Sequence, residues 1–284
     1  MRELSSALRA LSAAAPPPAD DRLKALNNEL RDKAEVGAGP WLPLESNPEI
    51  FTSFARKNGL PEQWRFSDIL GVDEGLLAMV ARPVAAVIFL FPCTENIYAA
   101  RAAEERAERA KVAAHGGLSE VAASAYHVEQ VASFGNACGT IAAVHALTNV
   151  KGIVGGFDGP LAAFRMETQD KTPAERGQVL VTSRHLKGES DEAATHESAQ
   201  TECPDRDGPN LDHHYCAFVP MADSAGAVHI VELDGTKFAP VDHGAVEGGH
   251  GRFLEGVAAL VQRKFMQLDP SRIDFSMMGL CPAE

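Results

Sequence analysis

One run of eight residues, VAAVIFLF at 84–91, holds no polar side chain and constrains the fold more than any other stretch of the chain. A strand that is apolar on both faces must be covered on both faces, so the run predicts a central strand of a sheet enclosed by helices. As a helix it is far too short to cross a bilayer, which needs roughly 20 apolar residues. Hydrophobic residues make up 45% of the 284 residues, enough to build one sizeable core or two.

Helix signals lie on both sides of this run. Asn47 is a suitable N-cap because Pro48 follows it at the first helical position, and Gly59 is expected to end that helix. The segment 99–117 mixes alanine with many charged residues and ends in two glycines. It predicts a solvent-facing helix.

Two strands are expected in the second half of the chain. HYCAFVP at 214–220 and AVHIVELDG at 227–235 are rich in β-branched and aromatic residues. The residues between them, ADSAGA, are typical of a turn, which we expect to centre near Ser224 and to close an antiparallel hairpin. Helices separated from a run of strands favour an α+β fold.

Charge and cysteine usage exclude several classes of function. The formal net charge of −13 argues against nucleic acid and anionic membrane as partners. The cysteines are odd in number and form no CxxC pair, which indicates free thiols in a reducing compartment, so we expect the cytoplasm or the nucleus. They stand at positions 93, 138, 203, 216 and 281.

Two segments differ in composition from the rest. Residues 1–40 are rich in alanine and broken by prolines, and we expect a flexible N-terminal extension before a domain at 41–284. Residues 187–212 hold eight acidic residues against two basic ones and almost no large apolar residue. This stretch predicts a long loop without an element of its own, which is either a solvated insertion or a mobile lid over a site.

Cys138 stands where a helix is expected to begin. GNACG precedes the apolar run TIAAVHAL, with Asn136 as the expected cap. The N–H groups and dipole at a helix N-terminus stabilise a thiolate and lower the pKa of a cysteine. A nucleophilic thiolate also needs a histidine and a group that orients it.

The hairpin supplies such a pair. With the expected register, His214 lies directly opposite Asp234, within reach of a hydrogen bond. His145 falls inside the helix after Cys138 and is expected to pack in the core, whereas His213 points to the other face of its strand. The pattern by itself leaves a purely structural cysteine open as the alternative to a Cys138–His214–Asp234 triad.

Several longer motifs resemble the ubiquitin carboxy-terminal hydrolase family, in particular its short single-domain cytosolic members. The resemblance covers 41–284 in the correct order and includes a piece of the family's active-site crossover loop, which we expect at 187–212. The matching segments are WLPLESNPEIFTSFARKNGLPEQWRFSDILGVDEGLLAMVARPVAAVIFLFP at 41–92, NACGTIAAVHAL, HESAQTE at 196–202, HHYCAFV, ELDGTKFAPVDHG and FMQLDPSRIDFSMMGL at 265–280.

The resemblance implies a papain-like fold with a central antiparallel sheet flanked by helices and a knotted backbone. It implies a thiol-dependent deubiquitinase, an omega peptidase that hydrolyses amide, ester or thioester bonds at the C-terminal glycine of ubiquitin through a thioester. Cys138 is then the nucleophile, His214 the general base and Asp234 the orienting carboxylate. No metal or organic cofactor is implied. Small or unfolded adducts are the expected leaving groups, NEDD8 stays open as a second substrate, and we expect a monomer.

One departure affects the oxyanion site. The family places a glutamine six residues before the nucleophile, where this chain has Ala132. Gln130 is the candidate instead, if the two additional residues form a bulge, whereas a shifted register would bring Ser133 or backbone N–H groups there. The altered segment keeps open a ubiquitin-binding module with weak or no catalysis. A generic papain-like endopeptidase is disfavoured because papain's local signature is absent.

Overall fold

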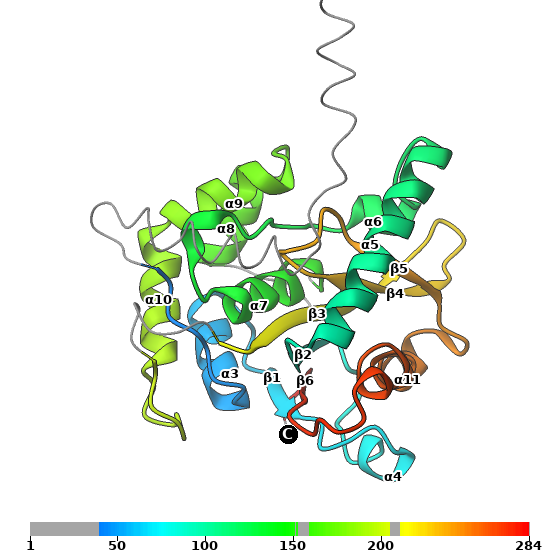
Figure 1. The fold of residues 1–284 in the computed structure, drawn as a ribbon. Coiled ribbons are helices and arrows are strands. Elements are labelled where there is room, and N and C mark those ends of the chain that lie inside the picture. The colour runs from blue at the N-terminus through cyan, green and yellow to red at the C-terminus, as the bar shows by residue number, and fades with distance from the viewer. Residues whose placement is uncertain (1–39, 151, 153–158, 205–210, 284) are drawn as a thin grey trace, which may run out of the picture.

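A six-stranded sheet forms the centre of the molecule, and every pair of neighbouring strands in it is antiparallel (Figure 1). The strand order is β1-β6-β2-β3-β4-β5. The strands are β1 (Trp64–Asp68), β2 (Ala86–Pro92), β3 (His213–Ala222), β4 (Val228–Leu233), β5 (Val241–Ala245) and β6 (Ser276–Pro282).

The computed structural model describes residues 40–150, 152, 159–204 and 211–283. The predicted N-terminal extension, 1–40, lies outside the described residues except for Pro40. None of the helices in the described ranges is both long and apolar enough to cross a membrane. All five cysteines lie in these ranges and are free thiols.

The apolar run of the sequence forms the middle of the sheet. β2 lies between β6 and β3, and only Leu90 among its seven residues is not buried. Ile88 packs in the core on one face of the sheet, whereas Val87, Phe89 and Phe91 pack in the core on the other. The prediction of a central strand covered on both faces is confirmed.

Helices cover both faces, which confirms the predicted α+β fold (Figure 1). One face packs against α3 (Pro48–Lys57), α6 (Glu120–Ser124), α7 (Cys138–Asn149), α8 (Pro160–Thr168), α9 (Pro173–Thr182) and α10 (Arg184–Ala194). The other packs against α4 (Glu74–Leu77), the first turn of α5 (Glu95–His115) and α11 (Phe253–Lys264). Three short 3-10 turns are η1 (Ala132–Phe134), η2 (Gly249–Arg252) and η3 (Met266–Leu268).

The helix ends follow the local signals of the sequence. Asn47 caps α3 by accepting a 2.9 Å hydrogen bond from the backbone N–H of Glu49, and Pro48 is the first helical residue. Gly59, just after α3, has a φ of 105°, which is the left-handed region that favours glycine. The predicted caps of this helix are confirmed.

The charged helix predicted at 99–117 begins earlier than expected. α5 starts at Glu95, because the Thr94 side chain accepts from the backbone N–H of Ile97 and so provides the N-cap. It ends before Gly116, whose φ of 73° is left-handed. Most of the helix is solvent-facing as predicted, but Arg101 is buried.

The segment 187–212 was expected to have no element of its own, and this is wrong for its first eight residues. They continue α10, which Ser183 caps at its N-terminus. The buried side of the helix is made largely of small residues, including Ser190 and Ala193, which a search for large apolar side chains misses. An ion pair of 2.5 Å between Lys187 and Asp191 adds to the helix. The non-helical part within the described residues therefore begins at Thr195.

Candidate active site

Two of the candidate catalytic residues predicted from the sequence lie at one end of the sheet. Because neighbouring strands are antiparallel, the C-terminal ends of β1, β2 and β4 lie beside the N-terminal ends of β6 and β3. His214 is the second residue of β3, and Asp234 directly follows β4. This end of the sheet therefore holds both residues of the predicted pair, although they are twenty positions apart in the chain.

His214 and Asp234 are in direct contact. The Nε2 atom of His214 lies 2.8 Å from Oδ1 of Asp234, and both side chains are buried. The opposed register predicted for them is wrong by two residues. Ala217 pairs with Leu233, because the turn centres one residue later than Ser224. A two-residue shift keeps both side chains on the same face of the sheet, so they meet diagonally instead of directly across the hairpin.

Asp234 is fixed as an ionised carboxylate. Its Oδ1 also accepts from the backbone N–H and the hydroxyl of Thr236, each at 2.8 Å, and its Oδ2 is paired with Arg101. Burial alone would raise the pKa of Asp234. The charges of His214 and Arg101 and the hydrogen bonds outweigh burial and hold the pKa well below its usual range.

The His214 ring is charged at neutral pH. Burial lowers its pKa, but the charge and hydrogen bond of Asp234 and the hydrogen bond with Cys138 together raise it to about 9. Since Nε2 faces Asp234, Nδ1 is the ring nitrogen left for the Cys138 thiol. The arrangement suits an imidazolium next to a thiolate.

Cys138 is the first residue of α7, as the sequence predicts. Asn136 is not its cap, and that expectation is wrong. The N-cap position falls on Ala137, and no side chain caps the helix. The helix start is thus not capped by a side chain, and the Cys138 thiol at this start is half-buried. A helix end with this polarity stabilises a thiolate and a developing oxyanion.

Gly139 leaves room for two segments to approach the nucleophile. A Cβ atom added there would lie 3.2 Å from Cβ of Leu44 and 3.2 Å from Cε2 of Tyr215. The Tyr215 hydroxyl in turn donates to the backbone carbonyl of Leu44 at 3.1 Å. The residues before α3 and the start of β3 therefore border the N-terminus of α7.

Gln130 lies between the aspartate turn and α7. Its backbone N–H donates to the backbone carbonyl of Gly235 at 2.8 Å. The two segments pack closely, because a Cβ atom added at Gly235 would be 3.0 Å from Cβ of Gln130 and from Cγ2 of Ile141. The side-chain Nε2 donates to the carbonyl of Gly135 at 3.2 Å. Its Oε1 is buried and has no hydrogen-bond partner among the described residues.

A local turn lies between Gln130 and Cys138. The 3-10 turn η1 follows Gln130, and Phe134 at its end is fully buried, with its ring 5.3 Å from that of Trp41. Ser133 is exposed. Gly135, which follows the turn, has a left-handed φ of 74°.

The other nearby histidines are not part of this arrangement. His145 is fully buried, and burial lowers its pKa to about 3, as fits the core residue that was predicted. His127 stacks on it and faces the backbone carbonyl of Asp234. His213 contacts Asp274 at 2.8 Å instead of Asp234.

The segment after α10 lies beside the site, where the sequence allowed a lid, and its attachment to Glu45 and Asn47 is the part that sequence patterns did not indicate. Both carboxylate oxygens of Glu45 accept from the backbone N–H of Gln200 at 3.1 Å, and one accepts from that of Thr201 at 2.7 Å. Asn47 donates to the carbonyl of Ser198 at 2.9 Å. We call residues 195–204 the strap. The strap is fastened one residue away from Leu44, which borders α7.

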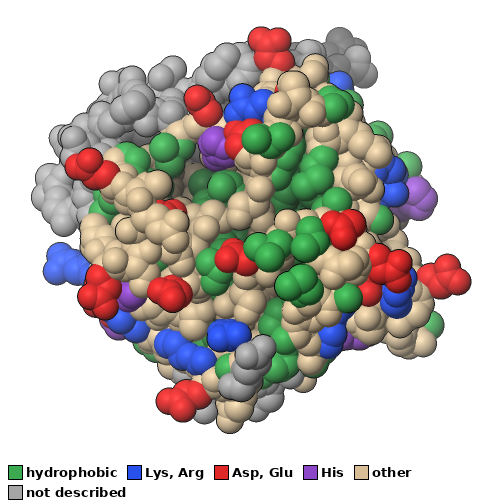
Figure 2. Space-filling view, turned by 90° about the horizontal axis from the view of Figure 1, so that it is seen from below, with side chains coloured by type: hydrophobic (Ala, Val, Ile, Leu, Met, Phe, Trp, Pro, Cys, Tyr) green, Lys and Arg blue, Asp and Glu red, His purple; other side chains and the backbone are tan. Residues whose placement is uncertain are grey.

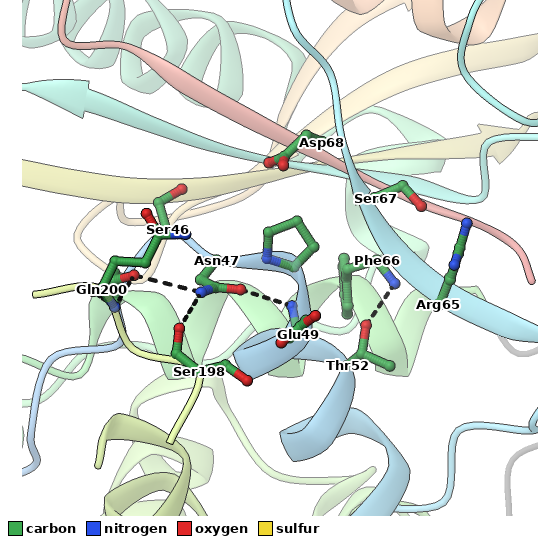
Figure 3. Close-up of a pocket in the computed structure, with 12 residues that line it drawn as sticks. Ser46, Asn47, Glu49, Thr52, Arg65, Phe66, Ser67, Asp68, Ser198 and Gln200 are labelled. Atoms are coloured by element: carbon green, nitrogen blue, oxygen red, sulfur yellow. Dashed lines mark hydrogen bonds between the residues drawn. The ribbon is translucent and has the colours of Figure 1, made fainter. Parts of the chain in front are cut away.

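A polar cavity of about 800 Å³ opens between the strap, the start of α3 and β1 (Figure 3). Partial burial raises the pKa of Asp68, and this carboxylate has no hydrogen-bond or ion-pair partner among the described residues. The lining residues are Glu45, Ser46, Asn47, Pro48, Glu49, Thr52, Arg65, Phe66, Ser67, Asp68, Ser198 and Gln200. The cavity lies at the same end of the sheet as His214, because β1 and β2 end there together.

The sequence is similar to those of known proteins of one family. The family described as ubiquitin carboxyl-terminal hydrolase, family 1, matches residues 41–267. A Drosophila melanogaster ubiquitin carboxyl-terminal hydrolase is 32% identical over 249 residues, which are 86% of this chain and 98% of the relative. An Aplysia californica ubiquitin carboxyl-terminal hydrolase is 35% identical over 81% of this chain and 96% of its own. The human ubiquitin carboxyl-terminal hydrolase isozyme L1 is 32% identical over 85% and 98%.

The fold is also shared with a solved structure. The Trichinella spiralis UCH37 catalytic domain, in a crystal structure bound to ubiquitin vinyl methyl ester, superposes with a TM-score of 0.63. The match covers 90% of this chain and all of the other, at 22% sequence identity. The α+β, papain-like fold expected from the sequence motifs is thereby confirmed.

Proposed function

Because the chain belongs to ubiquitin carboxyl-terminal hydrolase family 1, we propose that Cys138, His214 and Asp234 cleave bonds at the C-terminal glycine of ubiquitin. The chain is a cysteine-type ubiquitinyl hydrolase. The observation that carries the assignment of residues is the 2.8 Å contact between His214 and Asp234 beside a cysteine at an uncapped helix start.

The geometry supports a two-step reaction through a thioester. The Cys138 thiolate attacks the carbonyl carbon of the terminal glycine, and the His214 imidazolium gives its proton to the departing amine. The sulfur is then bonded to the acyl group. His214, now neutral, takes a proton from water as the oxygen attacks the thioester carbon. The C–S bond then breaks, the acyl group leaves as the free acid, and the Cys138 thiolate and His214 imidazolium are restored. Asp234 stabilises the charged imidazole in each step and holds its ring in place.

The oxyanion of each step needs hydrogen-bond donors. The backbone N–H of Cys138 lies at the positive end of α7, and Gln130 supplies an amide from the adjacent segment. One hydrogen of Gln130 Nε2 is engaged by Gly135 in the described state, which leaves the second for an oxyanion. The turn η1 and the left-handed Gly135, both between Gln130 and Cys138, support the bulge interpretation over a shifted register.

The same end of the sheet offers a surface for ubiquitin. The free carboxylate of Asp68 and the acidic side chain of Glu49 in the cavity suit the arginines of the ubiquitin C-terminal tail. Exposed apolar side chains adjoin it: Leu70 follows β1 and is 69% exposed, and Ile273 precedes β6 and is 93% exposed. Figure 2, which views the molecule from below, shows hydrophobic side chains close to acidic ones on that side of the molecule. Such a mixed patch is typical of a protein-binding surface.

The strap limits the leaving groups. Its fastening to Glu45 and Asn47 holds residues 195–204 close to Leu44, which borders the N-terminus of α7 with Cys138. A leaving group attached to the ubiquitin carboxyl must pass this strap. Small adducts and unfolded peptides pass, whereas a folded protein is excluded.

One observation supports a second candidate, a ubiquitin-binding protein with weak catalysis. Gln130 donates one amide hydrogen to the carbonyl of Gly135 in the described state. If that bond holds the amide away from the carbonyl under attack, the oxyanion has only backbone donors. The distinguishing experiment measures turnover of a ubiquitin fluorogenic amide beside the NEDD8 equivalent. We expect turnover with ubiquitin and none with Cys138→Ala, while the matched Cys93→Ala variant stays active. Binding without turnover would favour the second candidate. Turnover of the NEDD8 amide would show whether NEDD8 is also a substrate.

A further inference from the structure

Arg101 carries a buried positive charge into the candidate site from α5. The residue is 7% exposed although its helix is otherwise largely solvent-facing. Its Nη1 donates to Oε1 of Glu232 at 3.2 Å, and its Nη2 is paired with Oδ2 of Asp234. A buried arginine is costly unless it is paired. Here the two terminal nitrogens of the guanidinium are bonded to two carboxylates, Glu232 near the end of β4 and Asp234 just after it.

Aromatic rings fix the plane of this guanidinium. The Cζ atom of Arg101 lies 4.8 Å from the ring centre of Phe91 and 5.8 Å from that of Phe265. The Phe91 ring also packs edge-on against the ring of His214, with centres 5.5 Å apart. One phenylalanine therefore contacts both the imidazole and the arginine that flank the same aspartate. Such an enclosure leaves the guanidinium little freedom to rotate.

The two oxygens of Asp234 have separate partners. Oδ1 faces His214 and Thr236, and Oδ2 faces Arg101. From this division of contacts, we propose that Arg101 is a positioning residue that holds Oδ2 and so keeps Oδ1 directed at His214. The proposal rests on the triad assigned under the proposed function. It adds to the triad a residue of α5, a helix that supplies no group to the reaction steps themselves.

Lys237 offers a matched control in the same network. Its Nζ lies 2.6 Å from Oε2 of Glu104 and 2.8 Å from Oε1 of Glu232, and the side chain is 4% exposed. It is thus another buried cation that is paired with Glu232. The ion pairs of the Lys237 side chain among the described residues are with Glu104 and Glu232, whereas Arg101 is also paired with Asp234. Loss of Lys237 should disturb the packing and charge of the network without releasing the Asp234 carboxylate.

The test measures kcat and KM on a ubiquitin fluorogenic amide for Arg101→Met, Arg101→Lys and Lys237→Met, each in the parent and in an Asp234→Ala background. Thermal melting accompanies each variant. We expect Arg101→Met to lower kcat by roughly tenfold or more with KM within about twofold. Arg101→Lys should restore part of that loss. In the Asp234→Ala background the effect of Arg101→Met should shrink below about threefold, because its route of action is gone.

Lys237→Met is expected to lower the melting temperature by a comparable amount, with kcat within about threefold of the parent. Equal losses of kcat in Arg101→Met and Lys237→Met would overturn the proposal, as would an undiminished Arg101→Met effect without Asp234. Should Arg101→Met not fold, the kcat of Arg101→Lys in the two backgrounds decides in the same way. A parent that is inactive on the ubiquitin amide contradicts the proposed function, whereas an active parent with a fully active Arg101→Met contradicts only the role of Arg101.

Discussion

The Nε2 atom of His214 lies 2.8 Å from Oδ1 of Asp234 although the two residues do not face each other across β3 and β4. The strand pairing ends at Leu233, and the aspartate is placed by the turn that follows it. The backbone N–H and hydroxyl of Thr236 close that turn onto the carboxylate. The catalytic geometry therefore depends on the turn after β4 as much as on the sheet.

Under the proposed mechanism, this contact is expected to set the pH dependence of the reaction. Burial lowers the pKa of His214, but the charge and hydrogen bond of Asp234 and the contact with Cys138 outweigh burial and raise the pKa to about 9. We expect kcat/KM to fall as pH rises through about 9, because the imidazolium that protonates the leaving amine is lost. Asp234→Asn removes the charge and should move this alkaline limb towards the ordinary histidine pKa of 6.5.

The raised pKa of His214 can also be checked through the pH dependence of protein stability. A histidine whose pKa is higher in the folded than in the unfolded protein stabilises the fold fully below about pH 6.5. That contribution is lost as pH rises through about 9. The free energy of unfolding of the parent should decline over this window, and that of His214→Gln should decline less. An alkaline limb of kcat/KM that stays in place in Asp234→Asn would contradict the role of the pair.

Gln130 is expected to act on the oxyanion. Gln130→Ala should lower kcat by roughly 10²–10³ with little change in substrate binding, because a preorganised oxyanion donor is worth about 2.7–4 kcal/mol. Ser133→Ala, in the same segment but at an exposed position, serves as the control and should stay near the parent. A loss below about threefold in Gln130→Ala would assign the oxyanion to backbone N–H groups alone.

Asp68 is expected to contribute to substrate binding and not to chemistry. Asp68→Asn removes a free carboxylate from the cavity, so KM for a ubiquitin amide should rise, by about fivefold to tenfold at low salt, while kcat is kept. Glu62→Gln makes the same change of charge at an exposed site outside the cavity lining and should leave KM within about twofold. Equal KM values for Asp68→Asn and the parent at low salt would remove the cavity from the ubiquitin-binding surface.

The strap is expected to decide which leaving groups are accepted. A Gly/Ser insertion after Glu202 lengthens it beyond its fastening to Glu45, so folded leaving groups should pass. The lengthened variant should cleave ubiquitin–ubiquitin chains that the parent leaves intact. The same insertion between Ser224 and Ala225, in the hairpin turn, is the control for added length. If the lengthened variant and the parent cleave chains equally, the strap does not select the leaving group.

Local signals made much of the fold predictable. The apolar run of β2, the Asn47 cap of α3 and the β3–β4 hairpin each depend on residues close in sequence, and the structure contains all three. The family motifs added the order of the candidate residues along the chain. His214 and Asp234 were identified as partners even though the register was two residues off, since alternate residues share a face of a strand.

Features that depend on distant contacts were not predictable in this way. α10 is buried through Ser190 and Ala193, which carry no hydrophobic pattern, so its helix was missed. Arg101 has the charge typical of a solvent-facing helix, and only its pairing with Asp234, 133 positions away, reveals that it is buried. Glu45 likewise holds the strap through hydrogen bonds to residues more than 150 positions further along the chain.

Labelling by a ubiquitin C-terminal electrophile tests the central claim most directly. The claim is that Cys138 is an activated thiolate held beside a ubiquitin-binding surface, and such a probe requires both properties at once. Incubation of the full chain with the probe, followed by peptide mapping, should show one ubiquitin adduct on Cys138. The adduct should be lost in Cys138→Ala and kept in Cys93→Ala. An adduct on another cysteine, or none on a chain that still binds ubiquitin, would contradict the account.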